Sequence, residues 1–358
     1  MENSPSYTGS GLVNLVAEIE TRLIGEARFP GLENGDAVPP ADTYVLVLFD
    51  GLGVAQLEHP KADSFRSARE ATLESPFPSM TNVALATVAT GLTASQHGQV
   101  AHLTWFPDLG KVVNTLKWVT PHGHHVDYDY AELLPRPNVW ERLRAGGVEP
   151  ITVQPADFQT SPLTRATYRG ARFEGAWDAA DLVDATVSLA GEPRRFIFTY
   201  VPFVDVAGHV FGQGSEEFAE AMKAAAAVWD GIVAGLPPGA VVLGTADHGL
   251  IEVTDDEKFV IRDPKFDSLR FAGDPRGVQL WGSDELIDEL AELTGGSLTD
   301  PLPLLGPEPT ETARSRVGER LLLAPPGKVV IPKSFDKRLR GYHGGLSDEE
   351  VVIPLLVG

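Results

Sequence analysis

The chain has 358 residues, with 50 acidic and 29 Lys or Arg side chains, so its formal net charge is −21. This charge repels polyanions and argues against a nucleic-acid polymer or an anionic membrane as the partner. The absence of cysteine excludes disulfides and thiolate metal ligands, and it fits a reducing compartment. Because the start lacks a signal-peptide pattern and no stretch reaches the ~18 apolar residues of a membrane span, we expect a cytoplasmic protein.

Helical and strand patterns alternate along the chain. In order, they predict a helix over 12–23, a strand over 43–53, helices over 82–90 and 138–145, a strand over 194–205, a helix over 216–236 and a strand over 240–249. Each strand is an apolar run that ends in an aspartate and a loop. This alternation predicts an α/β fold with a mostly parallel central sheet and helices on both faces.

No linker or repeat divides the sequence, so we predict a single domain over 1–358 with two inserted segments. Residues 98–130 hold four aromatic residues among turn residues and are predicted to form a lid; these aromatics are either core or a platform for substrate. Residues 263–327 are rich in Pro, Gly and acid, and are predicted to form a cap with one helix over 283–293 and no strand that ends in Asp.

Acidic and imidazole side chains follow the predicted strands. Parallel strands end at one edge of a sheet, where ligands gather. The candidates are Asp50, Asp205, His209, Asp247, His248 and, near the carboxyl end, His343. An Asp–His pair alone is commonly structural, but four segments that supply only these residue types point to a shared site. Three carboxylates and three imidazoles suit two divalent metal ions, most readily Zn²⁺, with Mn²⁺ or Fe as alternatives.

Thr81 is the candidate nucleophile. It stands at the start of an apolar helical pattern, where free backbone N–H groups and the helix dipole favour a developing anion. A threonine at this position is also a common N-cap, and both roles are compatible. A hydroxyl needs a base or a metal to become nucleophilic at neutral pH, and the predicted metal cluster meets that need.

Five motifs in order carry a resemblance to a known family. They are FDGLG, PSMTNVALATVATGLTASQHG, YVPFVDVAGHVFG, TADHG and GYHGG, which together span roughly 44–345. This series resembles the type I phosphodiesterase/nucleotide pyrophosphatase family of the alkaline phosphatase superfamily. The resemblance implies an alkaline phosphatase-like fold, one zinc ion on Asp205, His209 and His343, and a second on Asp50, Asp247, His248 and the Thr81 oxygen.

Two positions depart from the family pattern. An asparagine that holds a phosphoryl oxygen in the family is replaced here by His102, and the aromatic residue after the nucleophile is replaced by Asn82. His102 or the Asn82 backbone N–H is therefore the candidate contact to the substrate. The alternatives are that the substrate differs from the family's, or that His102 is a hydrogen-bonded surface histidine without a contact to substrate. Base stacking would have to come from elsewhere, with Trp105, Phe106 and Phe203 as candidates.

Two further motifs are weighed as secondary. The HGHH motif over 122–125 is either a third metal site or a solvated loop, and the basic run over 333–341 either steers anionic substrates or is a solvated turn.

The predicted function is a metal-dependent hydrolase of phosphodiester or pyrophosphate bonds that forms a phosphothreonine at Thr81. The predicted partner is a small phosphorylated molecule, with a nucleotide as one candidate. A phosphonate hydrolase or phosphomonoesterase of the same superfamily is the first alternative, and a non-catalytic, metal-stabilised module that binds nucleotide or protein is the second. The sequence predicts no oligomeric state.

Overall fold

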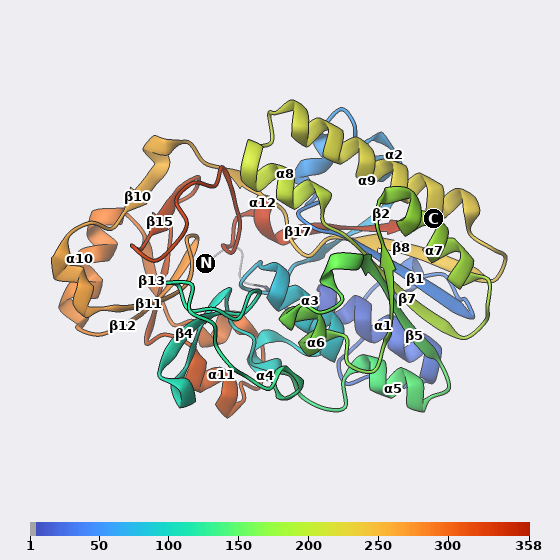
Figure 1. Ribbon diagram of the computed structural model, residues 1–358, viewed down its shortest axis with the longest axis horizontal. Helices are drawn as coiled ribbons and strands as arrows, with labels where there is room; N and C mark the ends of the chain where they lie inside the picture. Colours follow the sequence, from blue (N-terminus) through green and yellow to red (C-terminus); the bar gives the residue numbers. More distant parts are fainter. Residues whose placement is uncertain (1–4) are drawn as a thin grey trace.

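Two sheets lie side by side in the molecule, each with its own helices. The computed structural model describes residues 5–358, and Figure 1 shows the larger sheet beside a smaller one that carries α10 (Asp284–Thr294). No helix within residues 5–358 is both long enough and apolar enough to cross a membrane.

The larger sheet has seven strands. Their spatial order is β2 (Arg69–Glu74), β17 (Val352–Val357), β8 (Ala240–Thr245), β1 (Thr43–Phe49), β7 (Arg195–Val201), β5 (Glu149–Pro155) and β6 (Arg172–Ala176). The five strands from β8 to β6 are parallel, while β17 runs antiparallel to both of its neighbours. β1 lies between β7 and β8, and all seven of its residues are buried, as expected of a continuous apolar run covered on both faces.

Helices cover both faces of this sheet (Figure 1). One layer contains α2 (Asp63–Ala68), α7 (Ala179–Ala190) and α9 (Glu216–Gly235), and the opposite layer contains α1 (Leu12–Ile24), α3 (Thr81–Thr90), α5 (Val139–Ala145) and α6 (Pro162–Thr167). The predicted α/β class, with a mostly parallel sheet between helices, is confirmed.

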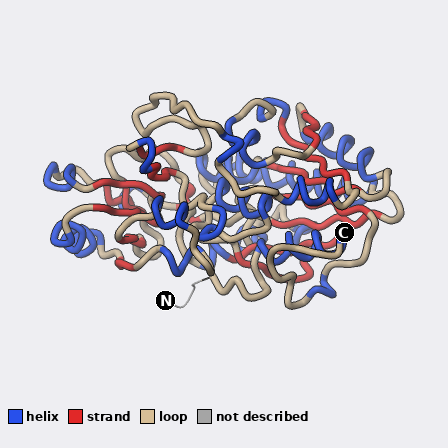
Figure 2. The backbone as a smooth tube through the Cα atoms, turned by 90° about the horizontal axis from the view of Figure 1, so that it is seen from below, coloured by secondary structure: helices blue, strands red, loops and turns tan. Residues whose placement is uncertain are grey.

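The smaller sheet joins the two inserted segments, which are distant in sequence. Its order is β13 (Ser297–Thr299), β14 (Arg320–Leu323), β12 (Gly277–Trp281), β11 (Arg270–Asp274), β3 (Leu103–Phe106) and β4 (Lys111–Asn114). All its pairings are antiparallel, and β11 joins the two segments by pairing with β3. Figure 2 shows this sheet beside the larger one.

The expectation that 263–327 lacks a strand ending in Asp is wrong. β11 ends in Asp274, and the segment also contains α11 (Glu311–Arg316), which contacts α4 (Ala94–His97). These strands are only three to five residues long, too short to give a clear period of two in the sequence. The roles of the two segments as lid and cap stay predictions.

The strand predicted over 194–205 ends early. β7 stops at Val201, and after Pro202 the chain enters α8 (Phe203–Phe211). Pro202 has no N–H to donate to a sheet ladder, so it favours the change from strand to helix. Asp205 and His209 therefore lie one helical turn apart rather than at a strand end.

Short elements complete the architecture. β10 (Lys258–Val260) pairs with β15 (Val329–Ile331), β9 (Ile251–Glu252) pairs with β16 (Gly341–Tyr342), and α12 (Asp348–Val351) precedes β17.

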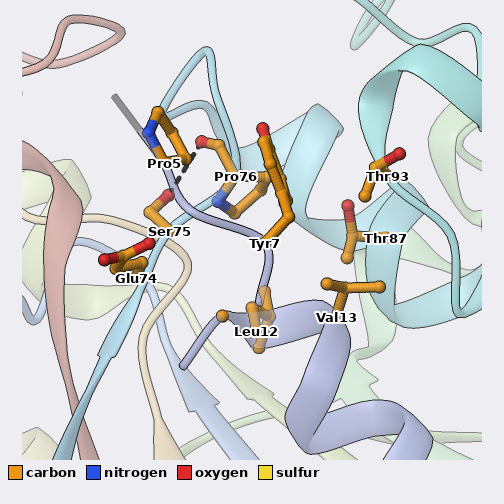
Figure 3. Close-up of a pocket in the computed structure, with 10 residues that line it drawn as sticks. Pro5, Tyr7, Leu12, Val13, Glu74, Ser75, Pro76, Thr87 and Thr93 are labelled. Atoms are coloured by element: carbon orange, nitrogen blue, oxygen red, sulfur yellow. Dashed lines mark hydrogen bonds between the residues drawn. The ribbon is translucent and has the colours of Figure 1, made fainter. Parts of the chain in front are cut away.

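The N-terminal segment closes a small pocket beside α1 (Figure 3). Tyr7 Oη donates a hydrogen bond to the Leu304 carbonyl at 2.8 Å and accepts one from the Phe77 N–H at 3.2 Å. The cavity volume is about 10 Å³, which is room for about one water molecule. It is too small for a phosphate ester, and none of the predicted ligands lines it.

Candidate active site

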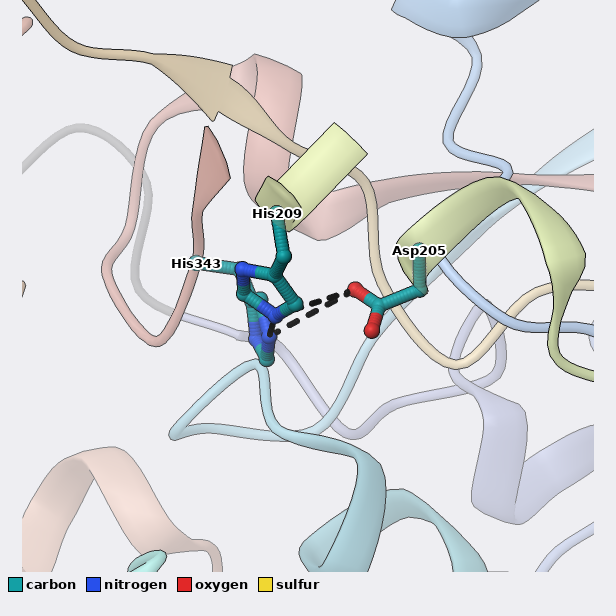
Figure 4. Close-up of side chains that lie close together, drawn as sticks. All are labelled: Asp205, His209 and His343. Carbon is teal, nitrogen blue, oxygen red and sulfur yellow. Dashed lines mark hydrogen bonds and ion pairs between the residues drawn. The ribbon is translucent and has the colours of Figure 1, made fainter. Parts of the chain in front are cut away.

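Asp205, His209 and His343 form the first cluster of candidate metal ligands. The first two share one face of α8, and His343 follows β16. His209 Nε2 lies 3.3 Å from Asp205 Oδ1 and 3.1 Å from His343 Nε2. Figure 4 shows the two imidazoles facing the Asp205 carboxylate. The three ligand atoms lie within 4.8 Å of one another, close enough to share one ion.

Asp50, Asp247 and His248 form the second cluster. β1 and β8 are neighbouring parallel strands, so the residues that follow them meet at one edge of the sheet. His248 Nε2 lies 3.3 Å from Asp247 Oδ2 and 3.6 Å from Asp50 Oδ1. All three side chains are buried.

The two clusters adjoin each other. The rings of His248 and His343 are stacked, with centroids 3.6 Å apart and planes 12° apart. This stack places one imidazole from each cluster in direct contact. The structure thus brings the six predicted carboxylates and imidazoles into a single site.

Backbone carbonyls orient each imidazole of the site. Nδ1 of His209 is 2.7 Å from the Gly341 carbonyl, Nδ1 of His343 is 2.8 Å from the Ser79 carbonyl, and Nδ1 of His248 is 3.1 Å from the Gly249 carbonyl. A carbonyl only accepts hydrogen bonds, so each Nδ1 carries the proton and each Nε2 presents a lone pair to the cluster. This pattern of outer hydrogen bonds is typical of histidines that bind metal.

Within the described part of the chain, the site contains buried carboxylate oxygens that lack hydrogen-bond donors or positive charges beside them. Asp205 Oδ1 and Asp247 Oδ2 are buried and accept no hydrogen bond from the residues described. Burial raises the pKa of Asp50 well above its ordinary value, and the Asp247 and Asp205 carboxylates raise it further. Burial also lowers the pKa of His343 well below its ordinary value, with His248 and His209 adding to the effect. Divalent cations would supply the missing positive charge, so the oxygen and nitrogen donors fit such ions.

Thr81 lies at the edge of the second cluster. Its Oγ1 is 3.1 Å from His248 Nε2 and 3.5 Å from Asp50 Oδ1. The N-cap of α3 is Met80, which leaves Thr81 as the first helical residue and its hydroxyl free to face the cluster. The N-cap alternative for Thr81 is therefore wrong.

Comparison with known proteins identifies the family. The model of the type I phosphodiesterase/nucleotide pyrophosphatase family matches residues 44–270, which is more than half of the chain. The chain belongs to this family. It is a phosphoric ester hydrolase, and the predicted resemblance is confirmed. No curated protein sequence matched the chain.

Solved structures share the fold at low sequence identity. Murine ectonucleotide pyrophosphatase/phosphodiesterase 5 has 17% identity and a TM-score of 0.64, over 88% of this chain and 87% of that one. Phosphonoacetate hydrolase from Sinorhizobium meliloti, in complex with phosphonoformate, has 18% identity and a TM-score of 0.63, over 89% and 90%. An inactive form of the murine protein was solved with AMP. These proteins thus hold small phosphorylated or phosphonate ligands on this fold.

Asn82 and His102 occupy different environments. The Asn82 side chain is buried and points away from the cluster, donating to the Ala101 carbonyl and to Thr115 Oγ1, both at 2.8 Å. Its backbone N–H, at the start of α3, remains the candidate contact because the first N–H groups of a helix have no partner within it. His102 is half-buried, and its backbone N–H lies 3.5 Å from Asp274 Oδ2.

The aromatic residues of 98–130 pack mainly against one another. Trp118 is fully buried and stacks on Tyr128 at 4.5 Å, with Phe106 beside both. Trp105 lies under the guanidinium of Arg270, 3.7 Å from its ring centroid. Of the two alternatives for these aromatic residues, core or substrate platform, the packing of Trp118 and Phe106 supports the core.

The secondary motifs lie outside the cluster. His122, His124 and His125 are exposed and take part in neither ligand group found within residues 5–358, which favours the solvated loop. In the basic run, Arg338 pairs with Asp336 and Lys333 with Asp267, which neutralises part of its charge.

Tyr200 and Ser79 were missed by sequence reasoning. Tyr200 lies opposite Leu48 in the register of β7 and β1, and its hydroxyl donates to Asp50 Oδ2. Ser79 supplies the carbonyl that holds His343. A tyrosine within a predicted buried strand was the available signal for Tyr200, because a buried hydroxyl needs a partner.

Proposed function

We propose that this hydrolase cleaves phosphodiester or pyrophosphate bonds of a small substrate through a phosphothreonine at Thr81. The observation that carries the proposal is the position of Thr81 Oγ1, within 3.5 Å of His248 Nε2 and Asp50 Oδ1. A hydroxyl on the rim of a carboxylate–imidazole cluster is placed to attack phosphorus. The family match supports the reaction class.

Two divalent ions, most readily Zn²⁺, would bind to the two clusters. Asp205, His209 and His343 would hold one ion. Asp50, Asp247, His248 and the Thr81 oxygen would hold the other. When bound, such ions lower the pKa of a hydroxyl or a water and neutralise charge on a phosphoryl group. Mn²⁺ and Fe remain alternatives for the same ligand set.

The chain's own groups account for the two displacements. Thr81 Oγ1 loses its proton and forms a bond to phosphorus, while the bond from phosphorus to the leaving oxygen breaks and that oxygen takes up a proton. Water then attacks the phosphothreonine, the bond from phosphorus to Oγ1 breaks, and Oγ1 regains a proton. The N–H of Asn82 and the imidazole of His102 are the proposed donors to the phosphoryl oxygen. Two inversions give retention at phosphorus.

A small phosphorylated substrate, such as a nucleotide, is the proposed partner, and a cytoplasmic location is part of the proposal. The lack of cysteine supports a reducing compartment. The non-catalytic alternative is set aside because the chain is a hydrolase by family.

Substitution of Thr81 tests the nucleophile. Thr81→Ala removes the attacking oxygen and is expected to lower kcat by about a thousandfold or more. Thr81→Ser keeps the hydroxyl and should retain activity and a phosphorylated residue 81, detected by mass spectrometry after acid quench. Unchanged hydrolysis by Thr81→Ala would reject the nucleophile.

A three-substrate panel tests the bond that is cleaved. We expect bis-nitrophenyl phosphate to give a higher kcat/KM than nitrophenyl phosphate or a phosphonate, in protein whose metal content is measured alongside. A large preference for the monoester or the phosphonate would replace the proposed substrate class by the first alternative.

A further inference from the structure

His102 is held by Asn114 across the hairpin of β3 and β4. His102 immediately precedes β3, and Asn114 is the last residue of β4, where it pairs with Leu103. Asn114 Nδ2 lies 2.8 Å from His102 Nε2. The backbone is fixed at the same place, because the Thr115 N–H donates to the His102 carbonyl at 3.1 Å.

The orientation of the Asn114 amide is set by two backbone groups. Its Oδ1 accepts hydrogen bonds from the N–H groups of Leu116 and Lys117, both at 3.1 Å. The oxygen cannot exchange places with the nitrogen, because an NH₂ group would then face two N–H donors. Nδ2 therefore faces His102, and an amide nitrogen can only donate.

The amide in turn determines the imidazole tautomer. His102 Nε2 must accept the Asn114 hydrogen bond, so it carries no proton in the neutral ring. The proton then sits on Nδ1. We propose that Asn114 is a positioning residue that fixes His102 as a neutral Nδ1–H donor to a phosphoryl oxygen of the substrate. This inference rests on the proposed function, in which His102 replaces the family's asparagine.

Asp274 places the backbone of His102 near the segment that carries His343. Its backbone N–H faces Asp274 Oδ2, and a Cβ added to Gly344, the residue after His343, would lie 3.0 Å from Asp274 Cβ. Burial lowers the pKa of His102 to about 4, with His209 and Lys117 adding to the effect. The ring is therefore uncharged at neutral pH.

A neutral donor has a consequence for substrate preference. A phosphodiester carries one negative charge at the reacting phosphate, while a monoester at neutral pH carries close to two. An imidazolium would favour the extra charge of the monoester, because charge-assisted hydrogen bonds are roughly twice as strong as neutral ones. By keeping His102 neutral, Asn114 favours the diester.

The tautomer is tested directly by long-range ¹H–¹⁵N NMR on protein with ¹⁵N-labelled histidine, with His102→Gln used to assign the signal. We expect a protonated Nδ1 and a bare Nε2 at pH 7. A proton on Nε2 would overturn the proposal. This readout does not depend on turnover, so it separates failure of the inference from failure of the proposed function.

Asn114→Asp tests the consequence with a nearly isosteric change. One carboxylate oxygen still accepts hydrogen bonds from the N–H groups of Leu116 and Lys117, while the other now accepts a hydrogen bond from His102 Nε2–H. The carboxylate raises the pKa of His102, so the ring is an imidazolium at low pH and loses its Nδ1 proton as the pH rises. We expect a new fall in diester kcat/KM with rising pH, of about a hundredfold. At pH values below this fall, the ratio of kcat/KM for the monoester to kcat/KM for the diester should be about fivefold higher than in the wild type.

Asn114→Asp combined with His102→Asn is the matched control and should lack the new pH dependence. The other titratable or charged groups near His102, which are Asp274, His209 and Lys117, are unchanged in every variant. A difference between the pH profiles therefore comes from the substitution at position 114 and its effect on His102. A pH profile of Asn114→Asp identical to that of the wild type would overturn the proposal. If that variant does not fold, the NMR measurement on the wild type still decides.

Discussion

Five histidines in this protein are held by hydrogen bonds at different ring nitrogens. The three imidazoles of the candidate metal site each donate a hydrogen bond from Nδ1 to a backbone carbonyl, whereas Nε2 of His102 accepts a hydrogen bond from Asn114. His97 shows a third arrangement. Its Nδ1 accepts from the Gln99 N–H at 3.1 Å, so its Nε2–H is the donor to Thr87 Oγ1 at 3.2 Å.

The buried His97 predicts a pH dependence of stability. Burial lowers its pKa to about 3, with the Arg316 charge adding to the effect. In the unfolded chain the pKa is near 6.5, so the folded state binds fewer protons. The stabilisation is fully present above about pH 6.5 and is lost as the pH falls toward 3. We expect His97→Gln to flatten the fall in melting temperature between pH 6.5 and 4.

The control for this prediction is His122→Gln, a change at an exposed histidine that should leave the slope as in the wild type. Thermal scans at several pH values, with constant metal content, provide the measurement. Equal slopes for His97→Gln and the wild type would show that another group governs acid unfolding.

Among the elements, the hairpin of β11 and β12 is linked by a buried ion pair to the segment that follows His343. Arg276, in the turn between these strands, pairs with Glu350 of α12 at 2.8 Å, and both side chains are buried. The other Glu350 oxygen accepts from the Gly345 N–H at 2.8 Å, two residues after His343. The ion pair therefore connects the smaller sheet to the loop that carries the candidate metal ligand His343.

Removal of Arg276 should be strongly destabilising. Arg276→Met leaves the Glu350 carboxylate buried without its partner, and we expect a loss of about 3–5 kcal/mol in the free energy of unfolding. Chemical denaturation measures this loss. The double variant with Glu350→Gln should recover part of it, because no uncompensated charge remains.

The matched control is the exposed pair of Arg338 and Asp336, which lies 2.6 Å apart. Arg338→Met is expected to leave the free energy of unfolding close to that of the wild type, because exposed ion pairs contribute little to stability. If Arg276→Met and Arg338→Met changed the free energy of unfolding by similar amounts, burial of the Arg276–Glu350 pair would not increase its contribution to stability.

At the scale of the whole molecule, the candidate metal site joins segments from residue 50 to residue 343. The candidate ligands come from α8 and from the segments that follow β1, β8 and β16, and Thr81 comes from α3. Three of the carboxylates behind the net charge of −21 meet there. Ions bound at this point would stabilise the folded state, since the unfolded chain does not assemble the ligands.

Removal of metal is therefore expected to lower the melting temperature and abolish turnover. When the free metal concentration is a hundred times the dissociation constant of a site, binding at that site adds about 2.7 kcal/mol to the free energy of unfolding. Thermal scans with and without chelator, followed by addition of Zn²⁺ or Mn²⁺, measure the effect and its reversal. Elemental analysis should find two ions per chain.

Asp247→Asn provides the control, because it weakens one cluster while the other remains intact. Its melting temperature should respond less to chelator than that of the wild type. Metal-free wild-type protein with full activity and an unchanged melting temperature would contradict the two-ion site.

The sequence by itself determined the α/β class and the chemical types at the site. Buried parallel strands appear as long apolar runs, and the residues that follow β1 and β8 must meet because those strands are parallel. The sequence alone therefore predicts that Asp50, Asp247 and His248 lie together. The resemblance of the motif series to the family added Asp205, His209, His343 and Thr81 to the same predicted site.

Only the tertiary structure decided the smaller sheet and the setting of His102. β3 and β11 are paired although some 170 residues separate Leu103 from Gly273, and strands this short carry no periodicity that specifies a partner. The role of Asn114 depends on which way its amide faces, and that is set by two N–H groups and a neighbouring ring in the folded hairpin. Such orientations arise from contacts in space, which local sequence patterns do not contain.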